Sequence, residues 1–82
     1  MDKPFPTFDD RGNKIEESYY IGHTLKWRKT FQYDEKNNII EEIQYNGDGS
    51  IKIQFKWDHD YIKNTRKIRV YDGEGNLLSD VQ

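Results

Sequence analysis

Apolar and polar residues alternate along much of the chain with a period of two, the spacing that gives a β-strand one apolar face. The clearest case is the segment from Ile51 to Trp57, in which every odd-numbered residue is apolar and every even-numbered residue is polar. No long segment has the 3.6-residue period of a helix. The pattern predicts strands at Lys14–Ile21, Leu25–Tyr33, Ile39–Asn46, Ser50–Trp57, Asn64–Tyr71 and Leu77–Val81.

A short motif recurs between the predicted strands. It consists of an aromatic residue, Asp, two variable residues, Gly or Asn, Asn, and an aliphatic residue within the next two positions. The Asp side chain can accept hydrogen bonds from backbone amides two residues on, and Gly or Asn tolerates the positive φ of a hairpin loop. The copies begin at Phe8, Tyr33 and Tyr71, with a weaker copy at Tyr45. We therefore expect an all-β fold, an antiparallel meander of about six strands joined by tight turns.

The copy Tyr33-Asp34-Glu35-Lys36-Asn37-Asn38-Ile39 and its relatives resemble the YD repeat of the RHS family, which reads roughly Tyr-Asp-x-x-Gly-Asn-Leu. This resemblance covers most of the chain in short units and implies strand–turn–strand elements in a β-sheet. Asn37 departs from the family's glycine, and the chain has too few repeats for the large hollow shell of RHS proteins. The resemblance therefore implies the geometry of the sheet and not the role of enclosing a toxin.

Three-residue loops at 22–24 and 47–49 would set the register of two hairpins. The pairs expected in the first hairpin are Ile15 with Phe31, Tyr19 with Trp27, and Ile21 with Leu25. Those expected in the second are Tyr45 with Ile51, Ile43 with Ile53, and Ile39 with Trp57. Both registers gather the large apolar residues on one face, together with the charged residues Glu17, Lys29 and Glu41. The other face would be polar, with Glu16, Ser18, Arg28, Thr30, Glu42, Gln44, Lys52, Gln54 and Lys56.

The chain offers no helix to cover the predicted apolar face. It lacks alanine, the best helix former, but contains 2 Trp, 6 Tyr and 4 Phe, which favour strands. Such a sheet can curl on itself, pair face to face in a homodimer, or dock on a partner. We expect a strongly curled sheet or a face-to-face homodimer.

Composition indicates one small domain, residues 1–82, with a flexible N-terminal segment at 1–7. Charged residues make up 34% of the chain and hydrophobic residues 33%, so the core is small. The absence of cysteine excludes disulfides and thiolate metal sites. No apolar run reaches the length of a membrane span, and the start lacks the apolar stretch of a signal peptide. We expect a cytoplasmic protein that does not contact membranes.

The sequence shows no arrangement of residues that requires a catalytic or metal-binding interpretation. The alternating Asp and Asn residues of the motif are explained by the turns, and Tyr45 holds the twelfth position of a calcium loop that would begin at Asp34. His23 and His59 fall in separate predicted loops. Glutamates on adjacent strands beside Lys29 are better explained as ion pairs than as a glycosidase pair. We expect no enzyme activity, no catalytic residues, no metal and no cofactor.

Two kinds of partner fit the remaining residues. A basic cluster at Lys63, Arg66, Lys67 and Arg69, beside aromatic residues on a sheet, is compatible with direct nucleic-acid contact, although the net charge of −2 argues against it. Exposed Tyr, Trp and Arg are the residue types that dominate protein interfaces. The candidate partner-binding residues are Tyr20, Arg28, Trp57, Tyr61, Arg66, Lys67 and Arg69.

These features predict a non-enzymatic interaction protein. Its richness in Lys, Asn, Ile and Tyr without alanine suggests an AT-rich coding sequence, which is common among small proteins of bacteriophages and mobile elements. The sharpest hypothesis is an inhibitor of a host defence nuclease, comparable to an anti-CRISPR protein, that binds a larger protein or ribonucleoprotein. The alternatives are a small nucleic-acid-binding sheet and a toxin-neutralising immunity protein.

Overall fold

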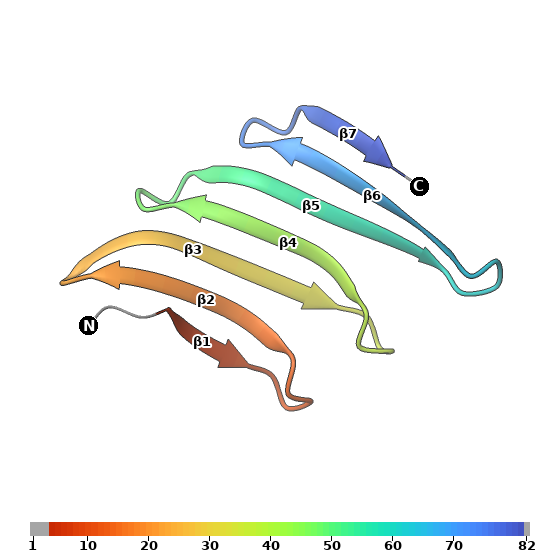
Figure 1. Ribbon diagram of the computed structural model, residues 1–82, viewed down its shortest axis with the longest axis horizontal. Helices are drawn as coiled ribbons and strands as arrows, with labels where there is room; N and C mark the ends of the chain where they lie inside the picture. Colours follow the sequence, from red (N-terminus) through yellow and green to blue (C-terminus); the bar gives the residue numbers. More distant parts are fainter. Residues whose placement is uncertain (1–3, 82) are drawn as a thin grey trace.

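The computed structural model describes residues 4–81, which form a single antiparallel sheet of seven strands (Figure 1). The strands follow one another in the order β1-β2-β3-β4-β5-β6-β7, so that each pairs with its neighbours in sequence. The sheet is not closed, and β1 and β7 are its two edges. The strands are β1 (Phe5–Phe8), β2 (Lys14–Ile21), β3 (Thr24–Tyr33), β4 (Ile39–Asn46), β5 (Ile51–Asp60), β6 (Thr65–Asp72) and β7 (Leu77–Val81).

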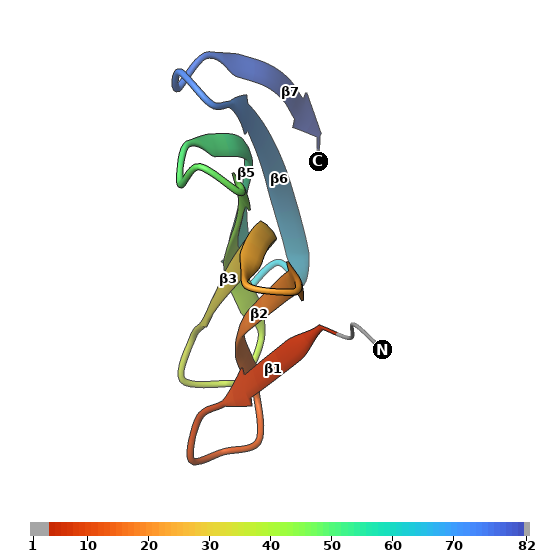
Figure 2. The ribbon, with the colours of Figure 1, turned by 90° about the vertical axis from the view of Figure 1, so that its left-hand side faces the viewer.

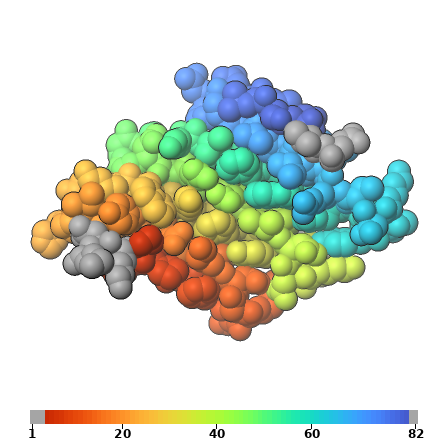
Figure 3. Space-filling view, viewed as in Figure 1, coloured from red at the N-terminus to blue at the C-terminus, as the bar shows by residue number. Residues whose placement is uncertain are grey.

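The sheet is a single twisted layer, as the side view in Figure 2 shows. Its principal extents are 47 × 32 × 16 Å, and all seven strands of the described residues belong to one sheet, so there is no second layer. Strands contact only their sequence neighbours, and the colours of Figure 3 follow the chain from one edge to the other. Among the residues with described side chains, none is buried. The strong curl expected from the sequence is therefore not confirmed, because the sheet does not fold over itself.

The predicted antiparallel meander is confirmed, with small changes at the ends of strands. The fourth predicted strand, which is β5, ends at Asp60 instead of Trp57, and the fifth, which is β6, begins at Thr65 instead of Asn64. The structure adds β1, which lies in the segment that we expected to be flexible; residues 1–3 of that segment lie outside the described residues. Pro6 weakens the sequence signal for this strand. A proline is tolerated here because β1 is an edge strand.

Four of the turns share one backbone geometry. In the turn between β1 and β2, the amide of Asp9 donates a hydrogen bond to the carbonyl of Asn13 (2.9 Å) and the amide of Gly12 donates to the carbonyl of Asp9 (3.1 Å). The turns with the same two bonds begin at Asp34, Asn46 and Asp72. These are the four copies of the sequence motif, so the motif encodes a turn of one type.

The positions that recur in the copies of the motif have direct structural roles. The Asp34 carboxylate accepts hydrogen bonds from the amides of Lys36 (2.9 Å) and Asn38 (3.0 Å), and Asp9 and Asp72 cap their turns in the same way. The fourth residue of each turn has a positive φ: 83° at Gly12, 66° at Asn37, 92° at Gly49 and 89° at Gly75. Gly and Asn occupy this position because they tolerate the left-handed conformation best.

A β-bulge follows each of these turns, and the sequence pattern did not reveal it. Tyr45 opposes Ile51, but the next pair is Gln44 with Ile53, so that Lys52 has no residue opposite it. The extra residues at the same place in the other three hairpins are Ile15, Ile40 and Leu78. Because an extra residue shifts the register by one, it changes which residues beyond the bulge share a face.

The bulge corrects the predicted register between β4 and β5. The observed pairs are Tyr45 with Ile51, Gln44 with Ile53, and Ile43 with Gln54. The first was predicted correctly. The predicted pairing of Ile43 with Ile53 is wrong by one residue, and the pairing of Glu41 with Lys56 likewise excludes the predicted partnership of Ile39 with Trp57.

The predicted register of the hairpin of β2 and β3 is correct at Tyr19 but wrong at the loop. Tyr19 opposes Trp27 as predicted, but Ile21 opposes Thr24 instead of Leu25. The loop therefore has two residues, 22 and 23, and a bulge lies next to Tyr19. Gly22 has a φ of 61°, a conformation that two-residue hairpin loops commonly require at their first position.

Candidate protein-interaction face

Directly opposed residues of an antiparallel sheet lie on the same face, so the pairing defines two faces. The row through the middle of the first face runs from Phe31 to Glu42, Phe55, Val70 and Ser79. We call this face the apolar face. Its large apolar residues are Tyr19, Trp27, Phe31, Ile53, Phe55, Trp57, Ile68 and Val70.

The aromatic rings of the apolar face form two stacked pairs. The ring centroids of Tyr19 and Trp27, opposite one another on β2 and β3, are 5.7 Å apart. Those of Phe55 and Trp57, two residues apart on β5, are separated by 6.0 Å. All four side chains remain partly exposed. These two pairs therefore offer aromatic surface that another protein can bury.

The apolar face also carries charges that cancel. The Lys14 ammonium lies 3.5 Å from the Glu17 carboxylate and 5.5 Å from the centroid of the Phe31 ring, and the Lys29 ammonium lies 5.1 Å from the centroid of Trp27. The cations on this face are Lys14, Lys29 and Arg66, and the anions are Glu17, Glu42 and Asp72. Among residues 4–81, the formal charges of this face therefore sum to zero.

The opposite face, which we call the charged face, contains the main ion pairs. The Arg28 guanidinium lies 2.9 Å from the Glu16 carboxylate and 4.2 Å from the centroid of the Tyr45 ring. Lys56 lies 3.9 Å from Glu41. Cross-strand ion pairs of this kind stabilise a solvated sheet face modestly.

Because of the bulges, two glutamates lie on the faces opposite to those predicted. We expected Glu41 on the apolar face and Glu42 on the polar face, together with Gln44. Glu42 opposes Phe55 and Gln44 opposes Ile53, so both lie on the apolar face, whereas Glu41 lies on the charged face. The prediction was wrong because it continued the register of the turn through the bulge.

The structure does not bring the seven candidate partner-binding residues together. Trp57 and Arg66 belong to the apolar face. Those on the charged face are Arg28, Lys67, Arg69 and Tyr20, whose ring lies 6.3 Å from that of Phe5. Tyr61 lies in the loop between β5 and β6.

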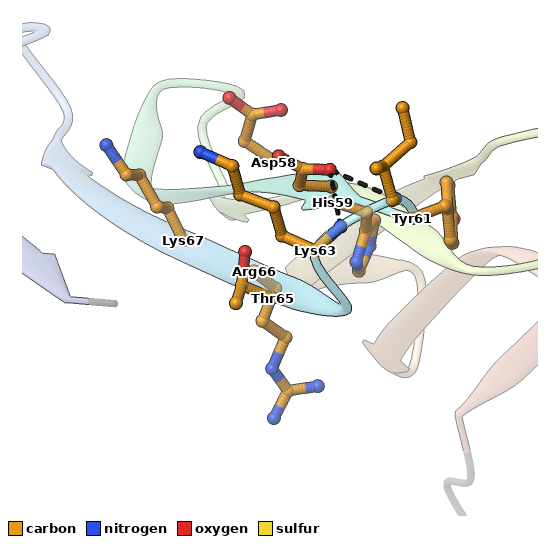
Figure 4. A pocket seen from close by; sticks show the side chains of 9 residues that line it. Asp58, His59, Tyr61, Lys63, Thr65, Arg66 and Lys67 are labelled. Carbon is orange, nitrogen blue, oxygen red and sulfur yellow. Dashed lines mark hydrogen bonds between the residues drawn. The ribbon is translucent and has the colours of Figure 1, made fainter.

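The predicted basic cluster is divided by the sheet. Figure 4 shows Lys67 and Arg66 on opposite sides of the β6 ribbon, as expected for consecutive residues of a strand. Lys67 opposes Asp58, and Arg69 lies between Lys56 and Asp80. The open hollow at this hairpin, lined by residues 58–63 and 65–67, therefore does not present one continuous basic surface.

Tyr61 joins the β5–β6 loop to the turn between β3 and β4. Its hydroxyl donates a hydrogen bond to the Asp34 carboxylate and accepts one from the Asn38 side chain (2.9 Å). The Lys36 ammonium lies 4.2 Å from the centroid of the Tyr61 ring, and the His59 ring stacks on it at 5.8 Å. These contacts hold the base of a loop whose tip, Ile62, is 97% exposed.

This contact shifts the pKa values of both partners. The hydrogen bond from Tyr61 is the main reason why the pKa of Asp34 is lowered, and the amides of Asn38 and Lys36 lower it further. The same hydrogen bond raises the pKa of the Tyr61 hydroxyl. Both shifts favour the state in which the tyrosine is protonated and the aspartate is charged.

The two histidines are placed differently. His59 Nε2 lies 2.7 Å from the carbonyl oxygen of Ile39, which holds the ring against β4. His23 is exposed in the two-residue loop between β2 and β3.

Within residues 4–81 no cluster of His, Asp or Glu is suited to hold a metal ion. The same part of the chain contains no helix that is long and apolar enough to cross a membrane.

The sequence interpretation missed the centre of the apolar face as a site. Phe31, Phe55 and Val70 were assigned only to strands, because apolar residues at alternate positions normally contribute to a core. The signal that identifies them is the combination of this alternation with the lack of any segment that covers them. Since these three residues belong to the middle row, they are the natural centre of an interface.

The chain has no match among protein-family models, curated proteins or solved structures. The resemblance of its turns to the YD repeat therefore stays a prediction.

Proposed function

We propose that this protein is a non-enzymatic interaction module that acts by laying its apolar face on the surface of a larger protein. One observation carries the proposal: none of the described side chains is buried, yet one face presents both tryptophans together with Tyr19, Phe31 and Phe55. Burying a single such side chain contributes roughly 1.5–3 kcal/mol. A partner that covers this face would thus supply the core that the sheet lacks.

The proposed target is a nuclease or ribonucleoprotein of a host defence system, which the protein would inhibit by occupying its surface. The composition of the chain motivates this choice of target. The form of the molecule supports inhibition by occlusion, because a broad sheet 47 Å long can cover an extended area without a deep pocket of its own. Toxin neutralisation would use the same face in the same manner.

The nucleic-acid alternative has less support. Arg66 and Lys67 lie on opposite faces, and Arg28 and Lys56 are engaged by glutamates at 2.9 and 3.9 Å. A nucleic-acid-binding surface needs several cations free to contact phosphates on one side of the protein. On the charged face, acidic residues alternate with these cations and oppose such binding.

Site-specific photo-crosslinking in cells that naturally contain the protein tests the proposal. A benzophenone amino acid at Phe31 would lie on the apolar face, whereas the same group at Thr30, the preceding residue of β3, would lie on the charged face. We expect a larger protein to be crosslinked from position 31 and not from position 30. Crosslinking from both positions alike, or to no larger protein, would contradict the proposal.

A further inference from the structure

The folded monomer has unusually little to hold it together. None of the side chains described in residues 4–81 is buried, and strands contact only their neighbours. Small domains are already marginal, because ordering each residue costs about 1.5 kcal/mol of conformational entropy. Such a sheet needs a covering layer as soon as it folds, whether or not a target is present.

The apolar face is large enough for a stable interface with a second layer. The sheet extends 47 Å by 32 Å, a rectangle of roughly 1,500 Å², whereas standard stable interfaces bury about 800 Å² on each partner. Even half of the rectangle therefore approaches the required area. Two sheets packed face to face at about 10 Å form the layered core of a β-sandwich.

The charges of this face suit a second copy of the same chain. Its described part carries three cations and three anions, so two copies can meet without net repulsion between like charges. Lys14 and Glu17 already pair at 3.5 Å, which lowers the cost of covering them. A strongly acidic or basic partner would find no complementary field here.

The edges of the sheet are less suitable for self-association. β1 has four residues, of which Pro6 has no amide hydrogen to donate to an added strand. β7 has only five residues. An added strand at either edge would leave the apolar face uncovered, so edge pairing does not solve the problem of the missing core.

We infer that, in the absence of a target, the apolar face is covered by a second copy of this chain, in a two-layer homodimer. This inference rests on the proposed function, because it assigns an occupant to the same protein-binding face. The target and the second copy would compete for that face. Formation of the complex with the target would then require the homodimer to open.

Sedimentation equilibrium over a wide range of protein concentrations tests the homodimer, with a matched pair of variants on β5. Phe55→Lys places a charge in the middle of the apolar face, and Gln54→Lys places the same charge on the charged face. We expect the wild-type chain and Gln54→Lys to dimerise. Phe55→Lys should weaken the dimer roughly 30-fold or more, as expected for a central interface residue.

Tryptophan fluorescence gives a second measurement that does not depend on a variant that folds. Trp27 and Trp57, the two tryptophans of the chain, both lie on the apolar face. Acrylamide quenching of the wild-type protein should increase on dilution at the same concentrations at which the dimer dissociates. If Phe55→Lys does not fold, this agreement still tests the location of the interface.

Three results would overturn the homodimer: a folded wild-type monomer at every concentration, a dimer in which both tryptophans stay accessible, or equal effects of the two lysine variants. Each of these results is separate from the crosslinking test. A folded monomer that crosslinks to a larger protein through position 31 would refute the homodimer and support the proposed function. A homodimer that crosslinks to no larger protein would support the homodimer and refute the proposed function.

Discussion

The Tyr61 hydroxyl donates a hydrogen bond to the carboxylate of Asp34, which precedes it by 27 residues. The contact joins the β5–β6 loop to the turn between β3 and β4, two connections that are not consecutive in the chain. Arg11 extends the same chain of contacts, because its guanidinium donates to the carbonyls of Asp34 and Glu35 at 3.0 Å. Hydrogen bonds between the side chains and backbone of these connections thus hold together one end of a sheet in which no described side chain is buried.

Removing the Tyr61 hydroxyl should raise the pKa of Asp34 toward its ordinary value. Tyr61→Phe keeps the ring that stacks on His59 but deletes the main hydrogen bond that lowers the Asp34 pKa. An NMR titration of the Asp34 carboxyl carbon measures the change. Asp72 is an internal control, because its pKa is lowered chiefly by the amide of Asn76 in its own turn and should not respond. An unchanged Asp34 pKa would contradict the assigned role of Tyr61.

The capping aspartates should make the protein sensitive to acid. Backbone amides lower the pKa values of Asp9 and Asp72, chiefly those of Asn13 and Asn76, and Tyr61 lowers that of Asp34. A carboxylate with a lowered pKa in the folded state stabilises it above the unfolded pKa of about 3.9, and this stabilisation is lost as pH falls through the folded pKa. At a fixed protein concentration, the urea midpoint should be constant above about pH 5 and fall below about pH 4.

A substitution of one cap separates this effect from the titration of other carboxyl groups. Asp72→Asn keeps an oxygen that can accept the amide hydrogen bonds but removes the charge. The variant should lose less stability between neutral and acidic pH than the wild-type protein does. Equal acid sensitivity of the two proteins would show that this turn does not contribute.

The motif and the two-residue alternation were sufficient to predict the meander, because both depend on local chemistry. An Asp that caps a turn and a residue with positive φ determine a hairpin wherever they occur. The bulge after each turn was not predictable in this way. Its extra residue is isoleucine in two hairpins, lysine in a third and leucine in the fourth, so no residue type marks it.

The candidate site could be predicted only in part, because the sequence does not show where the bulges lie. The choice of face for Glu41 and Glu42 depends on the bulge, and the division of Arg66 from Lys67 depends on the strand in which they lie. Proximity in sequence suggested a basic cluster, whereas a strand sends consecutive side chains to opposite faces. The uncovered apolar face was predictable, because the sequence contains no segment that could cover it.

Asn37 should tolerate replacement by glycine better than by alanine. Its φ of 66° lies in the left-handed region, which costs a residue with a Cβ roughly 1–2 kcal/mol, and asparagine tolerates it better than alanine does. Both variants lose the hydrogen bond from Asn13 Nδ2 to Asn37 Oδ1 (2.9 Å), so their comparison isolates the backbone. Asn37→Gly should be about 1 kcal/mol more stable than Asn37→Ala in urea denaturation. Equal stabilities would contradict the assignment of strain to this position.

Replacing Gly73 with alanine should lower the free energy of unfolding far more than an alanine at the same position of another turn. A Cβ at Gly73 would meet the carbonyl oxygen of Ile51 in the neighbouring strand, and one at Gly47 would likewise meet that of Leu25. Overpacking of this kind typically costs about 1–3 kcal/mol, because the backbone must move apart.

Glu35 holds the position of Gly73 in the turn between β3 and β4, where a side chain is accommodated. Glu35→Ala should therefore change the free energy of unfolding by no more than about 0.5 kcal/mol. Urea denaturation of both alanine variants at one protein concentration makes the comparison. A larger loss in Gly73→Ala would show that the close approach of Gly73 to Ile51 requires glycine. Comparable losses in the two variants would contradict this requirement.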